Sequence, residues 1–203
     1  MNSAQKLKIV LATRNNDKIQ EIKEVLKGLK IDILILDQFP GIPEVVEDGQ
    51  TIAENALKKA KVVSDATHLL ALADDTGLEV DYLGGRPGVY SSRFAGEEAT
   101  YDDNCNKLLK LMKEVPKEQR TARFRCVIAI IGSTIETIAE GVCEGFIINE
   151  KRGTQGFGYD PIFYVPEYDQ TFAEMSLSLK TEISHRGIAL KQARKILQQI
   201  IEG

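Results

Sequence analysis

The chain has 203 residues, of which 43% are hydrophobic and 28% are charged. These values are typical of a folded globular protein, and they exclude a disordered chain, a collagen-like chain and a disulfide scaffold. With 26 basic and 30 acidic residues, the formal net charge is −4. Proteins that wrap duplex DNA carry a basic face, so we expect no nucleic-acid polymer as a partner.

Three widely spaced cysteines, Cys105, Cys126 and Cys143, include no CxxC pair. Neither a zinc site nor a disulfide framework is indicated, and buried thiols in a reducing cytoplasm are expected. No apolar stretch approaches the roughly 20 residues that cross a bilayer. The amino-terminal segment has no apolar run typical of a signal peptide. We therefore expect a cytoplasmic protein with no membrane partner.

The first part of the chain alternates apolar runs with helical patterns. A buried strand is predicted over residues 7–12, and apolar residues at helical spacing predict a helix over 19–29. A second strand is expected over 32–36, followed by a loop over 37–49 that is rich in proline and glycine. Thr51 then opens a second helix with the pattern of a capping box.

The second part of the chain contains a long hairpin. A strand is expected over 69–73 and a helix over 102–112, and strands over 124–131 and 134–148 flank a Gly-Ser turn. The remaining expectations are an irregular segment over 84–88, a glycine-bearing loop over 154–161, an extended segment over 163–165 and a helix over 184–201. This order predicts an α/β fold, with helices on the faces of a mixed sheet. We expect one domain over 1–203 with two lobes.

The segment from Thr13 to Lys18, between the first strand and the first helix, is the first candidate site. Ligands collect at the carboxyl ends of strands in open α/β sheets. A helix N-terminus there offers unpaired N–H groups and about half a positive charge. Thr13, Asn15 and Lys18 add polar and charged groups, which suits a triphosphate, although no P-loop motif occurs. The alternative is that Asn15 or Asn16 only caps the helix.

Two adjacent carboxylates, Asp74 and Asp75, follow the strand expected over 69–73. They repel each other unless a cation lies between them and other acids. Glu44, Glu47 and Asp48 in the preceding loop could complete an oxygen site, and Mg²⁺ prefers a few carboxylates, several waters and substrate phosphates. The alternative is that one aspartate begins a turn and the other is solvated.

The loop over 156–161 is the third candidate. Its two glycines, Gly156 and Gly158, let the backbone approach a ligand closely. Phe157 and Tyr159 offer ring faces that could stack on a base, and Asp160 adds an acid. The alternative is an ordinary turn with core aromatic residues.

The fourth candidate combines Lys180 with Ser184, His185 and Arg186. Ser184 is a suitable N-cap, whereas basic residues in the first turn oppose the helix dipole. Residues placed against local preference tend to mark functional sites, so these cations could meet phosphate, ribose or base. The alternative is a solvated basic edge. The other histidine, His68, precedes an apolar strand and has no expected catalytic role.

Six sequence blocks occur in order along the chain: TRNNDK at 13–18, EDG at 47–49 with ENAxxKA at 54–60, ADDTGL at 73–78, GGRPGVYSSR at 84–93, GFGYDPxF at 156–163 and KxxxxHR at 180–186. With these blocks the chain resembles the non-canonical purine nucleoside triphosphate pyrophosphatases, also called inosine triphosphate pyrophosphatases, over nearly its whole length. The resemblance implies hydrolysis of ITP, dITP and XTP to the monophosphate and pyrophosphate. It also implies Mg²⁺ as cofactor, a homodimer, and an elongated mixed sheet with two lobes and a central cleft.

The resemblance also implies roles for individual residues. Asp75 is expected to act as general base and as a metal ligand, together with either Glu44 or Glu47. The residues expected to meet the phosphates are Thr13, Asn15, Lys18 and Lys59, with Thr76 nearby. The residues expected to meet sugar and base are Phe157, Gly158, Tyr159, Asp160, Lys180, His185 and Arg186. The alternatives are a Maf-like nucleotide pyrophosphatase that acts on other bases and a nucleotide-binding module without catalysis.

Overall fold

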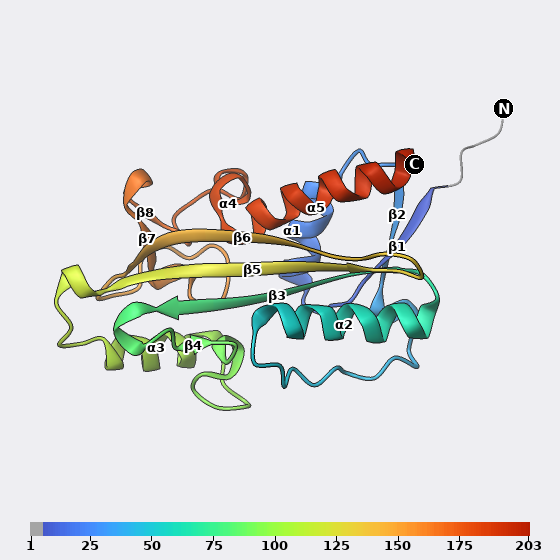
Figure 1. Ribbon diagram of the computed structural model, residues 1–203. Helices are drawn as coiled ribbons and strands as arrows, with labels where there is room; N and C mark the ends of the chain where they lie inside the picture. The colour runs from blue at the N-terminus through green and yellow to red at the C-terminus, as the bar shows by residue number, and fades with distance from the viewer. Residues whose placement is uncertain (1–5) are drawn as a thin grey trace. The chain divides into compact units, whose positions relative to one another are not determined.

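The computed structural model of the protein describes residues 6–203 (Figure 1). Its helices are α1 (Asn16–Leu26), α2 (Ile52–Thr67), α3 (Tyr101–Leu111), α4 (Leu177–Ile183) and α5 (His185–Glu202). Its strands are β1 (Leu7–Leu11), β2 (Ile31–Ile35), β3 (Leu70–Val80), β4 (Pro87–Gly88), β5 (Thr121–Ile131), β6 (Glu136–Ile147), β7 (Phe163–Val165) and β8 (Gln170–Thr171). Residues 1–5 lie outside the described residues. They belong to the amino-terminal segment for which no signal peptide is expected.

The strands form a mixed sheet in the order β2-β1-β3-β5-β6-β7-β8, with β4 beside β3. Strand β1 pairs in parallel with both β2 and β3, whereas β4 pairs antiparallel with β3, and β7 pairs antiparallel with β6 and β8. The predicted α/β fold with a mixed sheet is therefore confirmed. Among the helices formed by residues 6–203, none has the length and apolar character needed to cross a membrane.

The described chain divides into two compact units. Unit 1 contains residues 6–75, 127–140 and 189–203, and unit 2 contains residues 76–126 and 141–188. Strands β3, β5 and β6 and helix α5 contribute residues to both units. One domain with two lobes and a central cleft stays a prediction.

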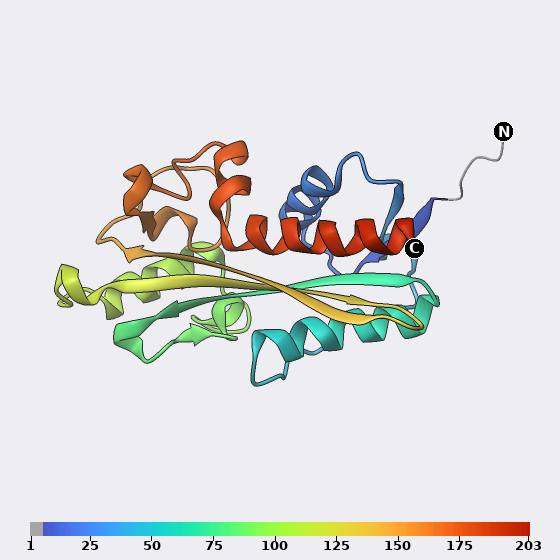
Figure 2. The same cartoon turned by 45° about the horizontal axis from the view of Figure 1, so that its top comes forward.

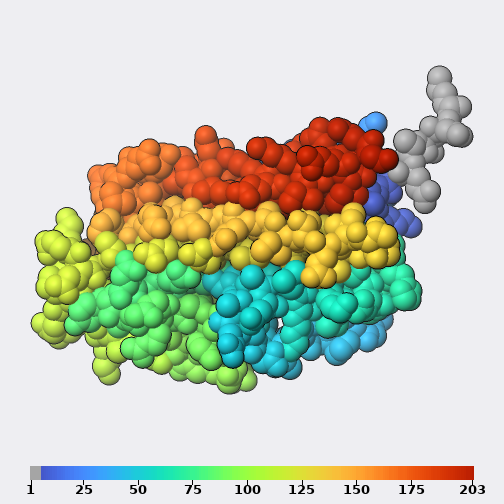
Figure 3. All heavy atoms as spheres, in the orientation of Figure 1, coloured from blue at the N-terminus to red at the C-terminus, as the bar shows by residue number. Residues whose placement is uncertain are grey.

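Unit 1 has a sheet of β1, β2 and β3 between helices. In Figures 1 and 2, α2 lies on one face of these strands, and α1 and the unit 1 part of α5 lie on the other. Figure 3 shows α5, in red, lying directly along the part of β6 that belongs to the same unit. The core contains apolar residues from every layer, among them Val10, Ile22, Ala60, Leu72 and Leu197. Each large apolar side chain buried in this way stabilises the fold by roughly 1.5–3 kcal/mol.

Helix α2 of unit 1, which carries Lys59, begins as the sequence predicts. The side chain of Thr51 accepts a hydrogen bond from the backbone N–H of Glu54, and the Glu54 carboxylate accepts one from the N–H of Thr51. This capping box satisfies two N–H groups that the helix itself leaves unpaired. The start of α2 is therefore fixed by local sequence.

Unit 2 has its own apolar core, in which α3 packs against β3, β5 and β6. The core side chains include Leu78, Leu108, Met112, Phe124, Phe163 and Phe172, all buried. Helix α4 contributes Leu179 and Ile183 at the edge of this cluster. The helical spacing of apolar residues in α3 and the alternation in β5 produce the faces that meet here.

A buried arginine connects three parts of unit 2. Arg120 is 3% exposed, and its guanidinium donates to the backbone carbonyls of Met112, Val115, Ile147 and Ile148 at 2.6–3.3 Å. Arginine offers five N–H donors in a fixed fork, so one side chain satisfies carbonyls after α3 and at the end of β6. We call this arrangement the Arg120 clip.

Several predictions about individual elements are wrong. The helix expected over 19–29 instead spans Asn16–Leu26, because Asn15 caps it. Strand β3 does not end at residue 73 but continues through Asp74 and Asp75 to Val80, because lysines pair with the two carboxylates and so allow them to be buried in the strand. The irregular segment expected over 84–88 includes β4, which pairs with Leu78 and Glu79. Helix α4 precedes α5 and was not predicted, because its seven residues are too few to give a clear pattern.

Replacing Arg120 with Met should destabilise the protein, because Met fills similar space but leaves the buried carbonyls without donors. We expect the free energy of unfolding to fall by about 3–5 kcal/mol, as measured by urea denaturation. The control is Lys113→Met, since Lys113 is exposed, and it should change stability by less than about 0.5 kcal/mol. A loss of under about 1 kcal/mol for Arg120→Met would contradict the Arg120 clip.

Candidate functional site

In unit 1, the parallel pairing of β1 with β3 brings the first two candidate segments together. Leu11 lies opposite Leu72, and the N–H of Ala12 donates to the carbonyl of Leu72 at 2.8 Å. The chain beyond β1 therefore runs beside Asp74 and Asp75. Lys18 Nζ lies 3.0 Å from Asp74 Oδ2, and the Asp74 side chain is fully buried. Two segments almost 60 residues apart thus form one cluster.

Lys59 of α2 lies between two carboxylates of the same unit. Its Nζ is 2.9 Å from Asp75 Oδ1 and 2.6 Å from Glu47 Oε1. Lys59 and Asp75 are both buried, whereas Glu47 is partly exposed. We call Glu47, Asp74, Asp75, Lys18 and Lys59 the carboxylate–lysine cluster; its three acids and two amines leave a formal charge of −1.

The pKa values of the buried pair follow from these contacts. Burial by itself would lower the pKa of Lys59, but the charges of Asp75, Asp74 and Glu47 outweigh it and raise the pKa above its ordinary value. Burial raises the pKa of Asp75, and the nearby charge of Lys59 opposes that rise. A carboxylate with a raised pKa is a better proton acceptor than an ordinary aspartate.

Over residues 6–203, no group of three or more His, Cys, Asp or Glu side chains is arranged to hold a metal ion by itself. The donor chemistry nevertheless fits Mg²⁺, which binds one or two carboxylates and takes its other ligands from water and phosphates. Oxygens of Glu47 and Asp75 already converge on one cation, the Lys59 ammonium. Glu44 is exposed, whereas Glu47 already contacts the ammonium that Asp75 also contacts, so the geometry favours Glu47 over Glu44 as the second ligand.

The segment between β1 and α1 forms the N-terminal cap of α1, and hydrogen bonds to the backbone orient its Thr13 and Asn15 side chains. Asn15 Oδ1 accepts hydrogen bonds from the backbone N–H groups of Asp17 and Lys18 at 2.9 and 3.2 Å. Thr13 Oγ1 accepts from the N–H of Asn15 at 3.2 Å. Asn15 therefore caps α1, while the predicted phosphate contacts of Thr13, Asn15 and Lys18 stay predictions.

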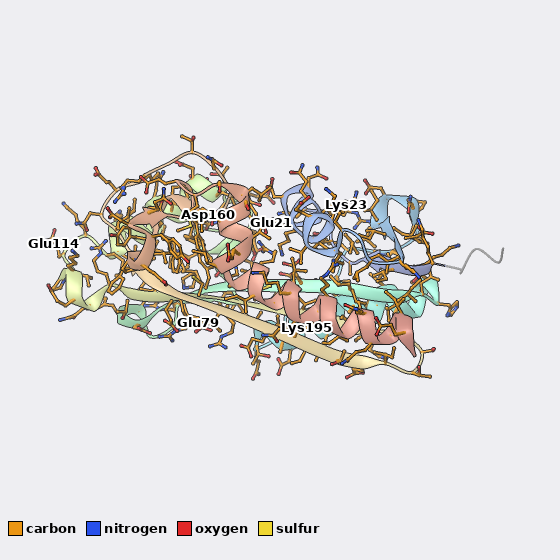
Figure 4. All side chains as sticks on the ribbon, turned by 90° about the horizontal axis from the view of Figure 1, so that it is seen from above. Glu21, Lys23, Glu79, Glu114, Asp160 and Lys195 are labelled. Carbon is orange, nitrogen blue, oxygen red and sulfur yellow. The ribbon has the colours of Figure 1, made fainter. Side chains whose placement is uncertain are left out.

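In unit 2, the third and fourth candidate segments come together around Asp160. Figure 4 labels Asp160, whose buried side chain lies among its neighbours in the unit. Its Oδ2 accepts from Lys180 Nζ at 2.7 Å and from the N–H of Phe157 at 2.9 Å. Lys180 Nζ also lies 4.9 Å from the centre of the Phe157 ring, and Arg186 Cζ lies 5.3 Å from it. The predicted basic residues are therefore gathered beside one aromatic ring.

The two aromatic residues of this loop have different surroundings. Tyr159 is buried in the core of unit 2, and its hydroxyl donates to the carbonyl of Ser91 at 2.9 Å. Its ring face is occupied by the core, so the expectation that Tyr159 stacks on a base is not supported by its position. Phe157 is only partly buried and is the ring in this loop that can meet a ligand.

His185 and Arg186 begin α5, directly after the predicted cap. Ser184 Oγ accepts from the N–H of Gly187 at 3.1 Å, which is an N-cap contact. Arg186 Nη2 donates to Thr76 Oγ1 at 3.1 Å, and both His185 and Arg186 are 3% exposed. The alternative of a solvated basic edge is therefore wrong, because these cations are buried among polar and aromatic partners.

Sequence reasoning missed the aromatic residues that surround His185. The ring centres of Phe124 and His185 are 4.5 Å apart, and their planes differ by 13°. The ring centres of Phe172 and His185 are 6.0 Å apart. Phe124 reads as an ordinary apolar residue of a strand, so only the folded chain reveals its contact with a residue 61 positions away.

Comparison with known proteins gives a consistent result. The sequence profile of the Ham1 family matches residues 9–196. The dITP/XTP pyrophosphatase of Desulforamulus reducens is 55% identical over 196 residues, which cover 96% of this chain and 97% of that protein. The dITP/XTP pyrophosphatase of Geobacter sulfurreducens is 51% identical over 185 residues, covering 90% of this chain and 92% of the relative. The solved structure of a HAM1 protein from Coxiella burnetii has a TM-score of 0.88 at 43% identity, covering 95% and 99% of the two chains.

Gly156 offers a test of the Asp160 arrangement. It has φ +75°, and an added Cβ would lie 2.0 Å from Asp160 Oδ2. Gly158 has φ +63° but has open space where its Cβ would be. Alanine at either position should cost about 1 kcal/mol of backbone strain, whereas Gly156→Ala should cost about 1–3 kcal/mol more because it displaces the carboxylate. Urea denaturation compares the two variants, and equal losses would rule out the close approach.

Proposed function

This chain belongs to the Ham1 family, and from that membership we propose that it hydrolyses dITP, ITP and XTP to the monophosphate and pyrophosphate. The observation that carries the proposal is the carboxylate–lysine cluster, in which buried acids and amines lie next to each other. Such a mixture suits a polyphosphate, because the amines can pair with its phosphates while the acids hold a cation or accept a proton. The relatives named dITP/XTP pyrophosphatase share more than half of this sequence over nearly its whole length; on this basis the Maf-like alternative is set aside.

Asp75 is the proposed general base. It takes a proton from a water that attacks the α-phosphorus; a new P–O bond forms there, the bond to the bridging oxygen breaks, and pyrophosphate leaves with that oxygen. The position of Asp75 suits this role, because it is buried beside one ammonium and its pKa is raised. A nearby cation keeps the carboxylate ionised, and burial increases its affinity for the proton.

Glu47 and Asp75 would hold Mg²⁺, which when bound neutralises charge on the phosphates and on the leaving pyrophosphate. Lys59 Nζ lies 2.6 and 2.9 Å from the same two carboxylates, and it would pair with the phosphates of the substrate. Lys18, with Asp74 as its partner, would neutralise a second phosphate. The Thr13 hydroxyl and the Asn15 side-chain amide would donate to the phosphates at the same end of the substrate, with Thr76 next to Asp75 nearby.

The cluster around Phe157 is the proposed site for base and sugar. Phe157 offers the stacking face, and Lys180, His185 and Arg186 offer donors. Hypoxanthine and xanthine have an oxygen at position 6, whereas adenine has an amino group there. Donors directed at a 6-keto oxygen would face another donor in adenine, and an unpaired buried donor costs about 1–3 kcal/mol.

A homodimer is the proposed assembly. Unit 2 has exposed aromatic residues, with Tyr82 53% and Tyr90 58% exposed, and a surface hollow next to Tyr90 lined by Arg86, Arg93 and Glu97. Exposed aromatic residues with arginines are typical of protein interfaces. The cytoplasm is the proposed compartment, and the burial of the three cysteines supports it.

A pyrophosphate-release assay over a panel of nucleotides tests the proposal. With Mg²⁺ present, dITP, ITP and XTP should be hydrolysed with kcat/KM at least about a hundredfold higher than dATP, because the amino group at position 6 of adenine would face the donors of the base site. Chelation with EDTA should abolish release, and added Mg²⁺ should restore it. Binding of dITP without any release would support a nucleotide-binding module instead.

Asp75→Asn should lower turnover of dITP by more than about a hundredfold, because the amide cannot accept the proton. The fold should persist, since Lys59 keeps Glu47 as a partner; circular dichroism and thermal unfolding check this. The matched control is Asp65→Asn on the exposed face of the same helix as Lys59, which should leave kcat unchanged. A near-normal kcat in Asp75→Asn would remove Asp75 from the base role.

A further inference from the structure

The imidazole of His185 lies on an aromatic surface inside unit 2. Phe124 is almost parallel to it, with 4.5 Å between ring centres and 13° between planes. Phe172 is the second ring on this surface, 6.0 Å from His185 with an angle of 26°. Phe124 and Phe172 are themselves stacked at 5.8 Å and 17°. We call these two phenylalanines the aromatic platform.

A platform of this kind controls the directions in which a histidine can form hydrogen bonds. The N–H and the lone pair of an imidazole lie in the ring plane, so fixing the plane fixes the plane of any hydrogen bond that the ring makes. Phe124 is 5% exposed and Phe172 is fully buried, and packing of this density leaves little room for the ring to tilt. The centre of the Phe172 ring also lies 5.9 Å from Lys180 Nζ. The platform is therefore close to two of the proposed base-site residues, His185 and Lys180.

We propose that Phe124 is a positioning residue for base selection, because its ring face sets the plane in which His185 meets the base. This inference rests on the proposed function and adds to it a residue that does not itself touch the substrate. The parallel stacking of the Phe124 and His185 rings is more specific than core packing requires, since aromatic pairs in cores also adopt edge-to-face arrangements. Phe163 shows that alternative here, with its ring edge-on to Phe124 at 4.7 Å and 61°.

Phe163 therefore provides a matched control for Phe124. Both are buried phenylalanines of the same apolar cluster, and Phe163 makes ring contacts with Phe124 and Phe172, whereas Phe124 is the ring that lies nearly parallel to His185. Changing either to leucine removes a similar volume, and both variants should lose comparable thermal stability. Only Phe124→Leu removes the flat surface under the imidazole.

The first experiment measures kcat/KM for dITP and dATP in both variants. Phe124→Leu should reduce the preference for dITP by about tenfold, chiefly through a higher KM for dITP, since an aromatic contact of this kind is worth about that factor. Phe163→Leu should keep the preference within about twofold of the wild type. Equal loss of preference in the two variants would overturn the proposal. If Phe124→Leu does not fold, Phe124→Met, whose flexible side chain adapts better to the space left by the ring, replaces it.

A double-mutant cycle tests whether Phe124 acts through His185. In a His185→Ala background, Phe124→Leu should cause no further change in the preference for dITP, because the group that it positions is gone. A change as large as in the wild-type background would show that Phe124 acts by another route, and the proposal would fail.

A second measurement does not depend on activity. The chain has two histidines, so His68→Gln leaves one set of imidazole signals for proton NMR. The His185 ring protons should be shifted upfield by the Phe124 ring, and the shift should disappear in Phe124→Leu but persist in Phe163→Leu. If the shift is absent from the wild type, the stacking is wrong. If the shift is present but dITP is not hydrolysed, the proposed function fails while the stacking holds.

Discussion

The burial of Lys59 between Glu47 and Asp75 is the constraint on which the rest of unit 1 depends. An isolated charge in a protein interior costs several kcal/mol, and it is tolerated only when opposite charges and hydrogen bonds surround it. Lys59 on α2 can be buried because Asp75 lies inside β3 and Glu47 lies on the loop before the helix. Asp74, in turn, needs Lys18 from α1. The helices flanking the sheet are thus connected to it by ion pairs as well as by apolar packing.

In unit 2, one ion pair and several aromatic rings make the burial of charged side chains possible. Asp160 and Lys180 are both buried and lie 2.7 Å apart, and the loop that carries Asp160 can approach this closely only because Gly156 has no side chain. The rings of Phe157 and Phe172 lie near the same ammonium. Positive charge is therefore held beside buried aromatic rings, a setting in which hydrogen bonds to a ligand are strengthened.

Much of the fold could be predicted because its signals are local. The capping box at Thr51, the hairpin of β5 and β6 and the apolar periodicity of α3 each depend on residues close together in sequence. The end of β3 could not be predicted in the same way. Asp74 and Asp75 read as the start of a loop, since only the lysines from α1 and α2 make it possible to bury them in a strand.

The sequence by itself determined the α/β class and the order of most elements, and its six blocks carry the residues that are predicted to form the site. Tertiary structure decided which of those residues meet. It paired Lys59 with Glu47 while leaving Glu44 exposed, placed the Tyr159 ring in a core and laid Phe124 against His185. The physical reason is distance along the chain: contacts between residues many positions apart depend on strand pairing and packing, which no local pattern encodes.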